Sequence, residues 1–174
     1  RQVQGNTSGI VITGIATAGK LGIGFTDNDV KIGNTALDSL TTGYNGVAVG
    51  NAALTANTTG ANNIAIGANA LDANTTGSSN NAVGYGALGA NTTANSNTAI
   101  GHVALGSNTT GTANVAVGAE ALDANTTASN NTAVGKATLG ANTTGASNVA
   151  VGANAKAANT TGSENTTVGY YADG

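Results

Sequence analysis

The chain has 174 residues, of which 7% are charged and 3% aromatic, with a net charge of −3 and no cysteine, proline, methionine or tryptophan. The absence of cysteine excludes a disulfide framework and a cysteine-ligated zinc site, and a single histidine excludes a multi-histidine metal site within one chain. Five basic residues do not form the positive stripe that nucleic-acid binding needs. No apolar run approaches the ~18 residues of a membrane span, so no membrane insertion by this segment is expected.

Residues 1–32 form a glycine-punctuated segment in which we find no repeat. Two stretches in it, residues 10–13 and 21–25, have the β-branched and apolar character of strands. We expect the segment to be a β cap for the exposed end of the structure that follows, or a linker to a preceding module. Because the sequence begins at Arg1 and not at Met, we also expect a fragment or a processed chain.

Residues 33–174 repeat every 17 residues without insertion or deletion, which gives about 8.4 units. An Asn-Thr-Thr triplet recurs with this spacing, and one glycine marks each step. Seventeen residues are too few for a helix-turn-helix repeat, which takes about 34. The glycines that mark the period are Gly33, Gly50, Gly67, Gly84, Gly101, Gly118, Gly135, Gly152 and Gly169.

Each unit contains a short β-branched triplet, such as residues 115–117, between an asparagine and a glycine that are typical strand limits. The Asn-Thr-Thr-Gly sequence indicates a turn. We therefore predict an all-β fold, a parallel β-solenoid (β-roll) in which each coil has one strand, a corner at the glycine, a second short segment through Ala-Leu, and a turn. Coils that stack about 4.8 Å apart would make a rod of roughly 40 Å.

Stacking places equivalent residues above one another, so each position of the unit becomes a column. The valine or isoleucine before each glycine forms one apolar ridge, and a leucine column forms another, which Lys156 and Asp173 end. The asparagine before each strand predicts a ladder of side-chain amides. That asparagine column consists of Asn63, Asn80, Asn97, Asn114, Asn131, Asn148 and Asn165.

Both faces of the predicted strands are apolar, because neighbouring side chains in Val-Ala-Val point in opposite directions. Strands that are apolar on both faces are usually buried on both. One face can fill the coil, and the other needs a partner, which predicts an oligomer with a shared core. In the alternative interpretation, alanine fills the coil and the valine ridge stays half exposed.

Side chains that could act in catalysis or metal binding are few and scattered along the sequence. Asp38, Asp72 and Asp123 share one repeat position, but the units between them lack an acidic residue there. This irregularity argues against a calcium-binding solenoid, which needs aspartate in every turn. Glu120 lies near Asp123 in the sequence, and we interpret the two as part of a surface charge cluster. We expect no enzyme, no catalytic or metal-binding residue and no cofactor.

The variable positions that follow each glycine and each turn are where a repeat array can vary without loss of its frame. We therefore take them as a candidate ligand-facing surface. Its members are Tyr44, Tyr85, His102, Glu120, Lys136, Tyr170 and Tyr171.

The two threonines of each Asn-Thr-Thr triplet form adjacent columns. Several antifreeze proteins bind ice through threonine arrays on a β-solenoid, so ice binding is an alternative function. On a strand, however, adjacent side chains point oppositely. Asn-Thr-Thr is also an N-glycosylation sequon, which would decorate one edge with sugar, whereas plain turn chemistry explains the same residues.

The sequences around residues 63–67, 114–118 and 148–152 resemble the N-x-V-A-I-G motif of YadA-like heads in trimeric autotransporter adhesins. Similar repeats occur in phage tail-fibre-like proteins. The resemblance covers residues 33–174 and implies a left-handed β-roll, three parallel chains around one axis, and adhesion. The period of 17 departs from the usual one of about 14, so known ligand surfaces do not transfer.

Together these features predict a non-enzymatic structural protein that is extracellular, on a cell surface or a virion fibre. We expect a homotrimer that forms the head or shaft of a surface adhesin or phage fibre and attaches to a host glycan or matrix protein. The alternative is a filament or biofilm-matrix subunit assembled end to end with neighbouring copies.

Overall fold

The computed structural model describes residues 4–6, 9–11 and 29–173, and every regular element in these residues is a β-strand. Near the N-terminus, β1 (Gln4–Asn6) and β2 (Gly9–Val11) pair antiparallel. β2 overlaps the strand expected over residues 10–13, and the strand expected over residues 21–25 lies outside the described residues. The described part of the chain contains no helix that could cross a membrane.

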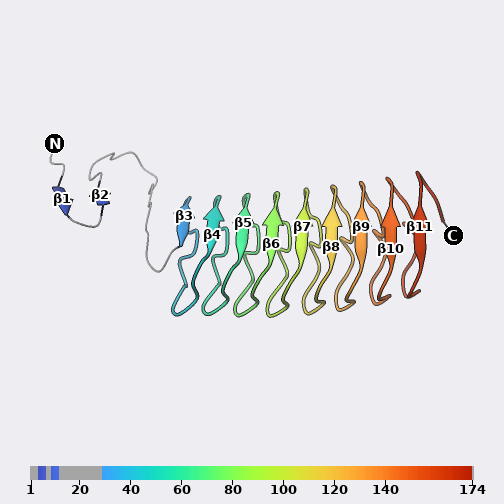
Figure 1. The fold of residues 1–174 in the computed structure, drawn as a ribbon, viewed down its shortest axis with the longest axis horizontal. Helices are drawn as coiled ribbons and strands as arrows, with labels where there is room; N and C mark the ends of the chain where they lie inside the picture. Colours follow the sequence, from blue (N-terminus) through green and yellow to red (C-terminus); the bar gives the residue numbers. More distant parts are fainter. Residues whose placement is uncertain (1–3, 7–8, 12–28, 174) are drawn as a thin grey trace.

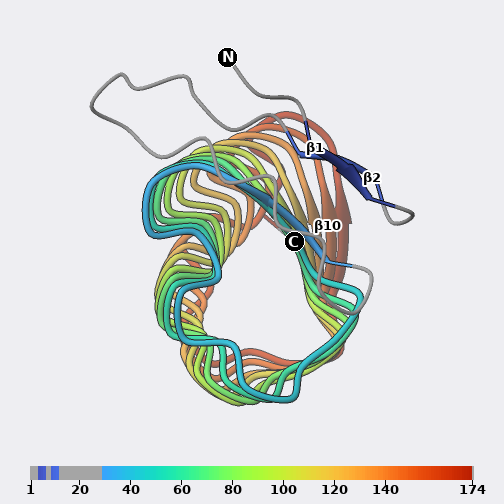
Figure 2. The same cartoon turned by 90° about the vertical axis from the view of Figure 1, so that its left-hand side faces the viewer.

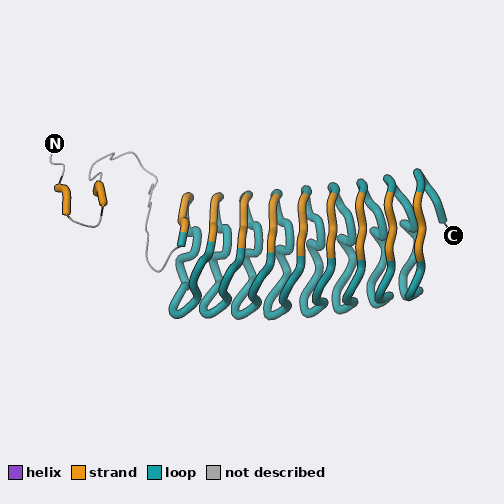
Figure 3. Tube along the Cα trace, in the orientation of Figure 1, coloured by secondary structure: helices purple, strands orange, loops and turns teal. Residues whose placement is uncertain are grey.

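The remaining nine strands form one parallel sheet in which sequence order equals spatial order (Figure 1). Neighbouring strands pair residues that are 17 apart, for example Ala99 with Ala116. Each coil contributes one three-residue strand at the same place, and turns form the rest of the coil (Figure 3). This arrangement confirms the predicted parallel β-solenoid. The strands are β3 (Val30–Ile32), β4 (Val47–Val49), β5 (Ile64–Ile66), β6 (Asn81–Val83), β7 (Thr98–Ile100), β8 (Val115–Val117), β9 (Thr132–Val134), β10 (Val149–Val151) and β11 (Thr166–Val168).

The sheet begins at Val30, three residues before the start predicted from the glycine period. Asp29 occupies the position that holds asparagine from Asn63 onward, and Lys31 occupies that of the strand alanine. The Lys31 ammonium lies 2.5 Å from a carboxylate oxygen of Asp38. Residues 29–32 thus follow the repeat register, although their residue types hide it.

The glycine that marks the period forms the corner after each strand, with φ between +128° and +142°. A Cβ atom on Gly101 would lie 2.4 Å from the carbonyl oxygen of Gly118 in the next coil. Both the backbone conformation and this close approach require a residue without a side chain. The nine glycines predicted as structural therefore have a physical reason to recur.

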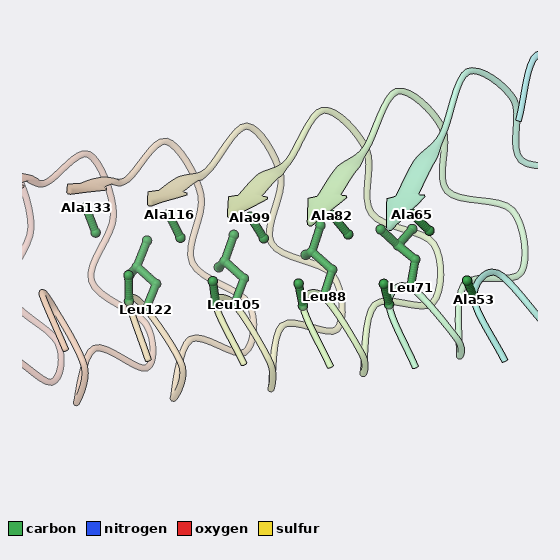
Figure 4. Close-up of a cluster of buried hydrophobic side chains, with 14 of the residues drawn as sticks. Ala53, Ala65, Leu71, Ala82, Leu88, Ala99, Leu105, Ala116, Leu122 and Ala133 are labelled. Carbon is green, nitrogen blue, oxygen red and sulfur yellow. The ribbon is translucent and has the colours of Figure 1, made fainter. Parts of the chain in front are cut away.

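The segment through Ala-Leu is built from turns, with leucine at φ between +49° and +53°. A left-handed conformation costs a residue such as leucine roughly 1–2 kcal/mol. The leucine side chains point from this wall toward the strand alanines, as Leu105 and Ala99 illustrate (Figure 4). Their burial inside the coil offsets the local strain. The six fully buried leucines are Leu54, Leu71, Leu88, Leu105, Leu122 and Leu139.

Viewed along the stack, the coils superimpose (Figure 2). Two columns of buried asparagine complete their interior. In the predicted column, the side-chain oxygen of Asn97 accepts a hydrogen bond from the backbone N–H of Asn114 at 3.0 Å, and its Nδ2 donates to the Gly111 carbonyl at 2.9 Å. The second column holds the asparagine of Asn-Thr-Thr. There Asn108 Nδ2 donates to Asn91 Oδ1 at 3.2 Å and to the Gly111 carbonyl at 3.0 Å. In the column before the strands, the side-chain amides also bond to one another at four of six steps, as from Asn114 Nδ2 to Asn97 Oδ1 at 3.2 Å, so the predicted amide ladder is confirmed at those steps. The second ladder was missed.

Candidate interaction surfaces

One candidate surface is the outward face of the sheet, which we define as the first and third residues of strands β3–β11. The middle residue of these strands points into the coil and is a fully buried alanine in seven of the nine strands. The flanking residues point outward and are half-buried or exposed. Ile66 and Ile100 remain 40% and 43% accessible. Along these strands, the large apolar side chains therefore lie outside the coil, and the small ones inside.

The outward face carries no charged residue in any of these nine strands. The third position is valine or isoleucine throughout: Ile32, Val49, Ile66, Val83, Ile100, Val117, Val134, Val151 and Val168. The first position is mixed: Val30, Val47, Ile64, Asn81, Thr98, Val115, Thr132, Val149 and Thr166. Only the third position was predicted as a ridge. The first position, which includes Asn81, was missed because that column mixes apolar and polar residues.

The predicted ligand-facing residues are exposed but do not form one patch. Tyr85, His102, Lys136 and Tyr170 follow the corner glycine in their coils, whereas Tyr44 lies after the first turn, which reads Leu-Thr-Thr in place of Asn-Thr-Thr. The Tyr85 and His102 rings stack in adjacent coils, with 5.6 Å between centroids and 14° between planes.

At the last coil, the Tyr170 and Tyr171 rings meet edge to face with 4.6 Å between centroids. Glu120 and Tyr171 occupy the second position after the glycine. The geometry therefore offers two separate aromatic pairs, and ligand binding by any of these residues stays a prediction.

The acidic residues do not converge. Burial raises the pKa of the Asp72 carboxyl, against backbone hydrogen bonds that lower it. Burial likewise raises the pKa of Asp123, with a smaller contribution from the negative charge of Glu120. Asp72 and Asp123 are three coils apart, about 14 Å along the stack, which is wider than the carboxylate pairs of glycoside hydrolases. Among the described residues, no group of three His, Asp or Glu side chains could hold a metal ion.

The two threonine columns have different environments. The hydroxyl of Thr58 donates to the backbone carbonyl of Thr75 in the next coil at 3.0 Å, and the same bond recurs along its column. The second threonine of each triplet is exposed along the whole array: Thr42, Thr59, Thr76, Thr93, Thr110, Thr127, Thr144 and Thr161. Only one of the two columns therefore offers free hydroxyls.

The burial of the sequon asparagines bears on glycosylation. The side chains of Asn74, Asn91 and Asn108 have no accessible surface and are bonded in the second ladder. A glycan on Nδ2 would remove these bonds and has no path to solvent. In the folded coil, these sequons serve the interior of the solenoid and cannot carry sugar.

No protein-family model, curated protein or solved structure matches this chain. The geometry of its surfaces is therefore the basis for any statement about function.

Proposed function

We propose that this chain is a structural subunit of an extracellular adhesive fibre, and that three parallel copies assemble through their outward faces. The observation that carries the proposal is the uncharged face of valine, isoleucine, threonine and one asparagine that runs along all nine strands. A sheet of this length and three residues of width presents about 400 Å², which is comparable to the largest exposed patch of a typical soluble monomer, and such patches are often functional.

The repeat itself favours a second copy as the partner. The outward side chains recur at the strand spacing of about 4.8 Å. A surface that packs between them along the whole sheet must have the same spacing, and another copy of the solenoid has it. The resemblance to YadA-like heads supports a parallel trimer, and in that reading the solenoid is a rigid spacer that displays its exposed corners for attachment to a glycan or matrix protein.

The native mass in solution tests the proposal. Light scattering on a size-exclusion column should give a species near 49.5 kDa, three times the chain mass of 16.5 kDa. Ile100→Lys places a charge on the outward face and should reduce the mass to that of one chain without loss of the β-type circular dichroism spectrum. Thr93→Lys adds the same charge at an exposed turn and should leave the trimer intact. A monomeric wild type would overturn the proposal, and open-ended polymers would favour the filament alternative.

The exposed threonine column supports ice binding as a second candidate. Its eight hydroxyls are free and evenly spaced, but they form a single column. A thermal-hysteresis measurement distinguishes the two functions, since an ice binder would depress the freezing point and lose the effect in Thr93→Lys.

A further inference from the structure

We propose that Asn81 fixes the axial register in which copies of this chain align along their outward faces. The inference rests on the proposed function, because it requires that the outward face be covered by other copies. It adds a residue that determines which of several similar alignments forms.

A regular repeat creates a problem of alignment. The third position of every strand is valine or isoleucine, so a slip by one coil or two coils again places these residues opposite one another. Apolar contact has no direction. A slip of two coils among nine strands also keeps most of the overlap. The third-position column therefore distinguishes poorly between alignments.

The threonines of the first position do not remove the ambiguity. Thr98, Thr132 and Thr166 alternate with Val115 and Val149. From Thr98 onward, a slip of two coils therefore places threonine opposite threonine and valine opposite valine. This pattern disfavours a slip of one coil and permits a slip of two.

Asn81 breaks the pattern. It is the only amide on the outward face of strands β3–β11, and its side chain makes no hydrogen bond within the described part of the chain. Ile64 precedes it and Thr98 follows it in the same column, and Ile66 and Ile100 lie in the adjoining strands. A partner that covers these isoleucines therefore covers the amide as well.

The aligned register brings the Asn81 amides of the copies to the same height. Each amide can donate two hydrogen bonds and accept two, so like amides can satisfy one another. A slip of two coils places the amide opposite Val47 or Val115, which have no hydrogen-bonding side chain. A buried asparagine specifies register in coiled coils in the same way.

Cysteine crosslinking tests the inference, since the chain has no native cysteine. Val83 and Val117 occupy the same column two coils apart. Val83→Cys chains and tagged Val117→Cys chains are co-expressed and oxidised, and the tag separates like from mixed disulfides on a gel. The aligned register gives like disulfides, and a slip of two coils gives mixed ones.

We expect mixed disulfides to be rare in the otherwise native chain. Adding Asn81→Val to both chains should raise their share about tenfold, because the penalty for an unpaired buried amide is removed. The variant introduces the residue that stands naturally at position 115 of the same column, so the coil should persist. Thr132→Val is the matched control and should leave the share unchanged.

An unchanged share in Asn81→Val, or an equal rise in Thr132→Val, would overturn the inference while the trimer stands. A monomeric native mass would overturn the proposed function, and the inference with it.

Discussion

The inner and outer faces of the same nine strands carry side chains of opposite size. The inner face is mostly alanine with no accessible surface, whereas the outer face is largely valine and isoleucine that stay partly accessible. The interior has room only for small strand residues because leucines from the opposite wall point into it (Figure 4). Two ladders of buried asparagine fill the rest of the interior. The strand is thus apolar on both sides, but only the inner side has a partner within the chain.

Truncation of a large side chain to alanine should give the largest difference in stability between the inner and outer sides. Leu105→Ala removes a fully buried side chain opposite the strand alanines and should reduce the free energy of unfolding by about 2–5 kcal/mol. Ile100→Ala removes a half-exposed side chain, so the isolated chain should lose much less. Urea unfolding at several protein concentrations measures both. An Ile100→Ala cost that matches that of Leu105→Ala at the lowest concentration would contradict the assignment of inner and outer sides.

Substitution by a larger side chain should also cost more stability on the inner face than on the outer face, but the difference should be smaller. Ala99→Ile forces three extra carbons into the filled interior, and such overpacking typically costs about 1–3 kcal/mol. Thr98→Ile changes the adjacent outward residue into one that the same column already holds at Ile64. It should be neutral or slightly stabilising. Thermal unfolding followed by circular dichroism compares the two variants, and equal costs would argue against a filled interior.

The same comparison of inner and outer faces can be made with polar side chains, since Asn97 lies inside the coil and Asn81 on the outward face. Asn97→Ala removes the acceptor of the buried Asn114 N–H, and an unsatisfied buried donor costs about 1–3 kcal/mol. Asn81→Ala on the outward face breaks no bond within the chain and should leave the stability of the isolated chain nearly unchanged. Hydrogen exchange should show faster exchange of the Asn114 amide only in Asn97→Ala.

In the first coil, Asp29 occupies a buried position where an asparagine amide should be more stable than a carboxylate. Asp29 Oδ1 accepts the Gly46 N–H at 2.5 Å, but its Oδ2 is buried and has no hydrogen-bond partner among the described residues. In later coils, the amide nitrogen at this position donates to a carbonyl 14 residues ahead, as from Asn63 to Gly77. Asp29→Asn should restore that bond and add about 1 kcal/mol of stability. Asp38→Asn is the control, since its carboxylate is exposed and paired with Lys31; a loss of stability in Asp29→Asn would refute the assignment.

Substitution of Asp123 should give the smallest change in stability, because its side chain is only partly buried. Its raised pKa means that the folded chain binds a proton more tightly than the unfolded chain does. The carboxyl therefore favours folding at a pH below its unfolded pKa, and this contribution is lost as the pH rises through the folded pKa. Asp123→Asn should slightly raise the thermal midpoint at neutral pH and have no such benefit in acid. A gain that persists in acid would point to another cause.

The sequence predicted the period, the strand, the glycine corner and one asparagine ladder, because each depends on a column that repeats a residue type with a known preference. The left-handed leucines could not be predicted, since leucine avoids this conformation and adopts it only where the stack buries its side chain. The ladder of Asn108 and its equivalents was hidden by turn and sequon chemistry that uses the same residues. Strand β3 was missed because Asp29 and Lys31 replace the repeat residues.

The hydrogen bonds between coils have a mechanical consequence. They join each coil to the next along the long axis of the stack, as between Thr98 N and Asn114 O. Tension applied through one end of the chain acts first on the bonds that hold the terminal coil, so coils should detach singly from that end. Each detached coil would release 17 residues, about 55–60 Å of extended chain in place of a rise of about 4.8 Å. Under load, the rod would lengthen in equal steps at a nearly constant force, and each step would dissipate energy.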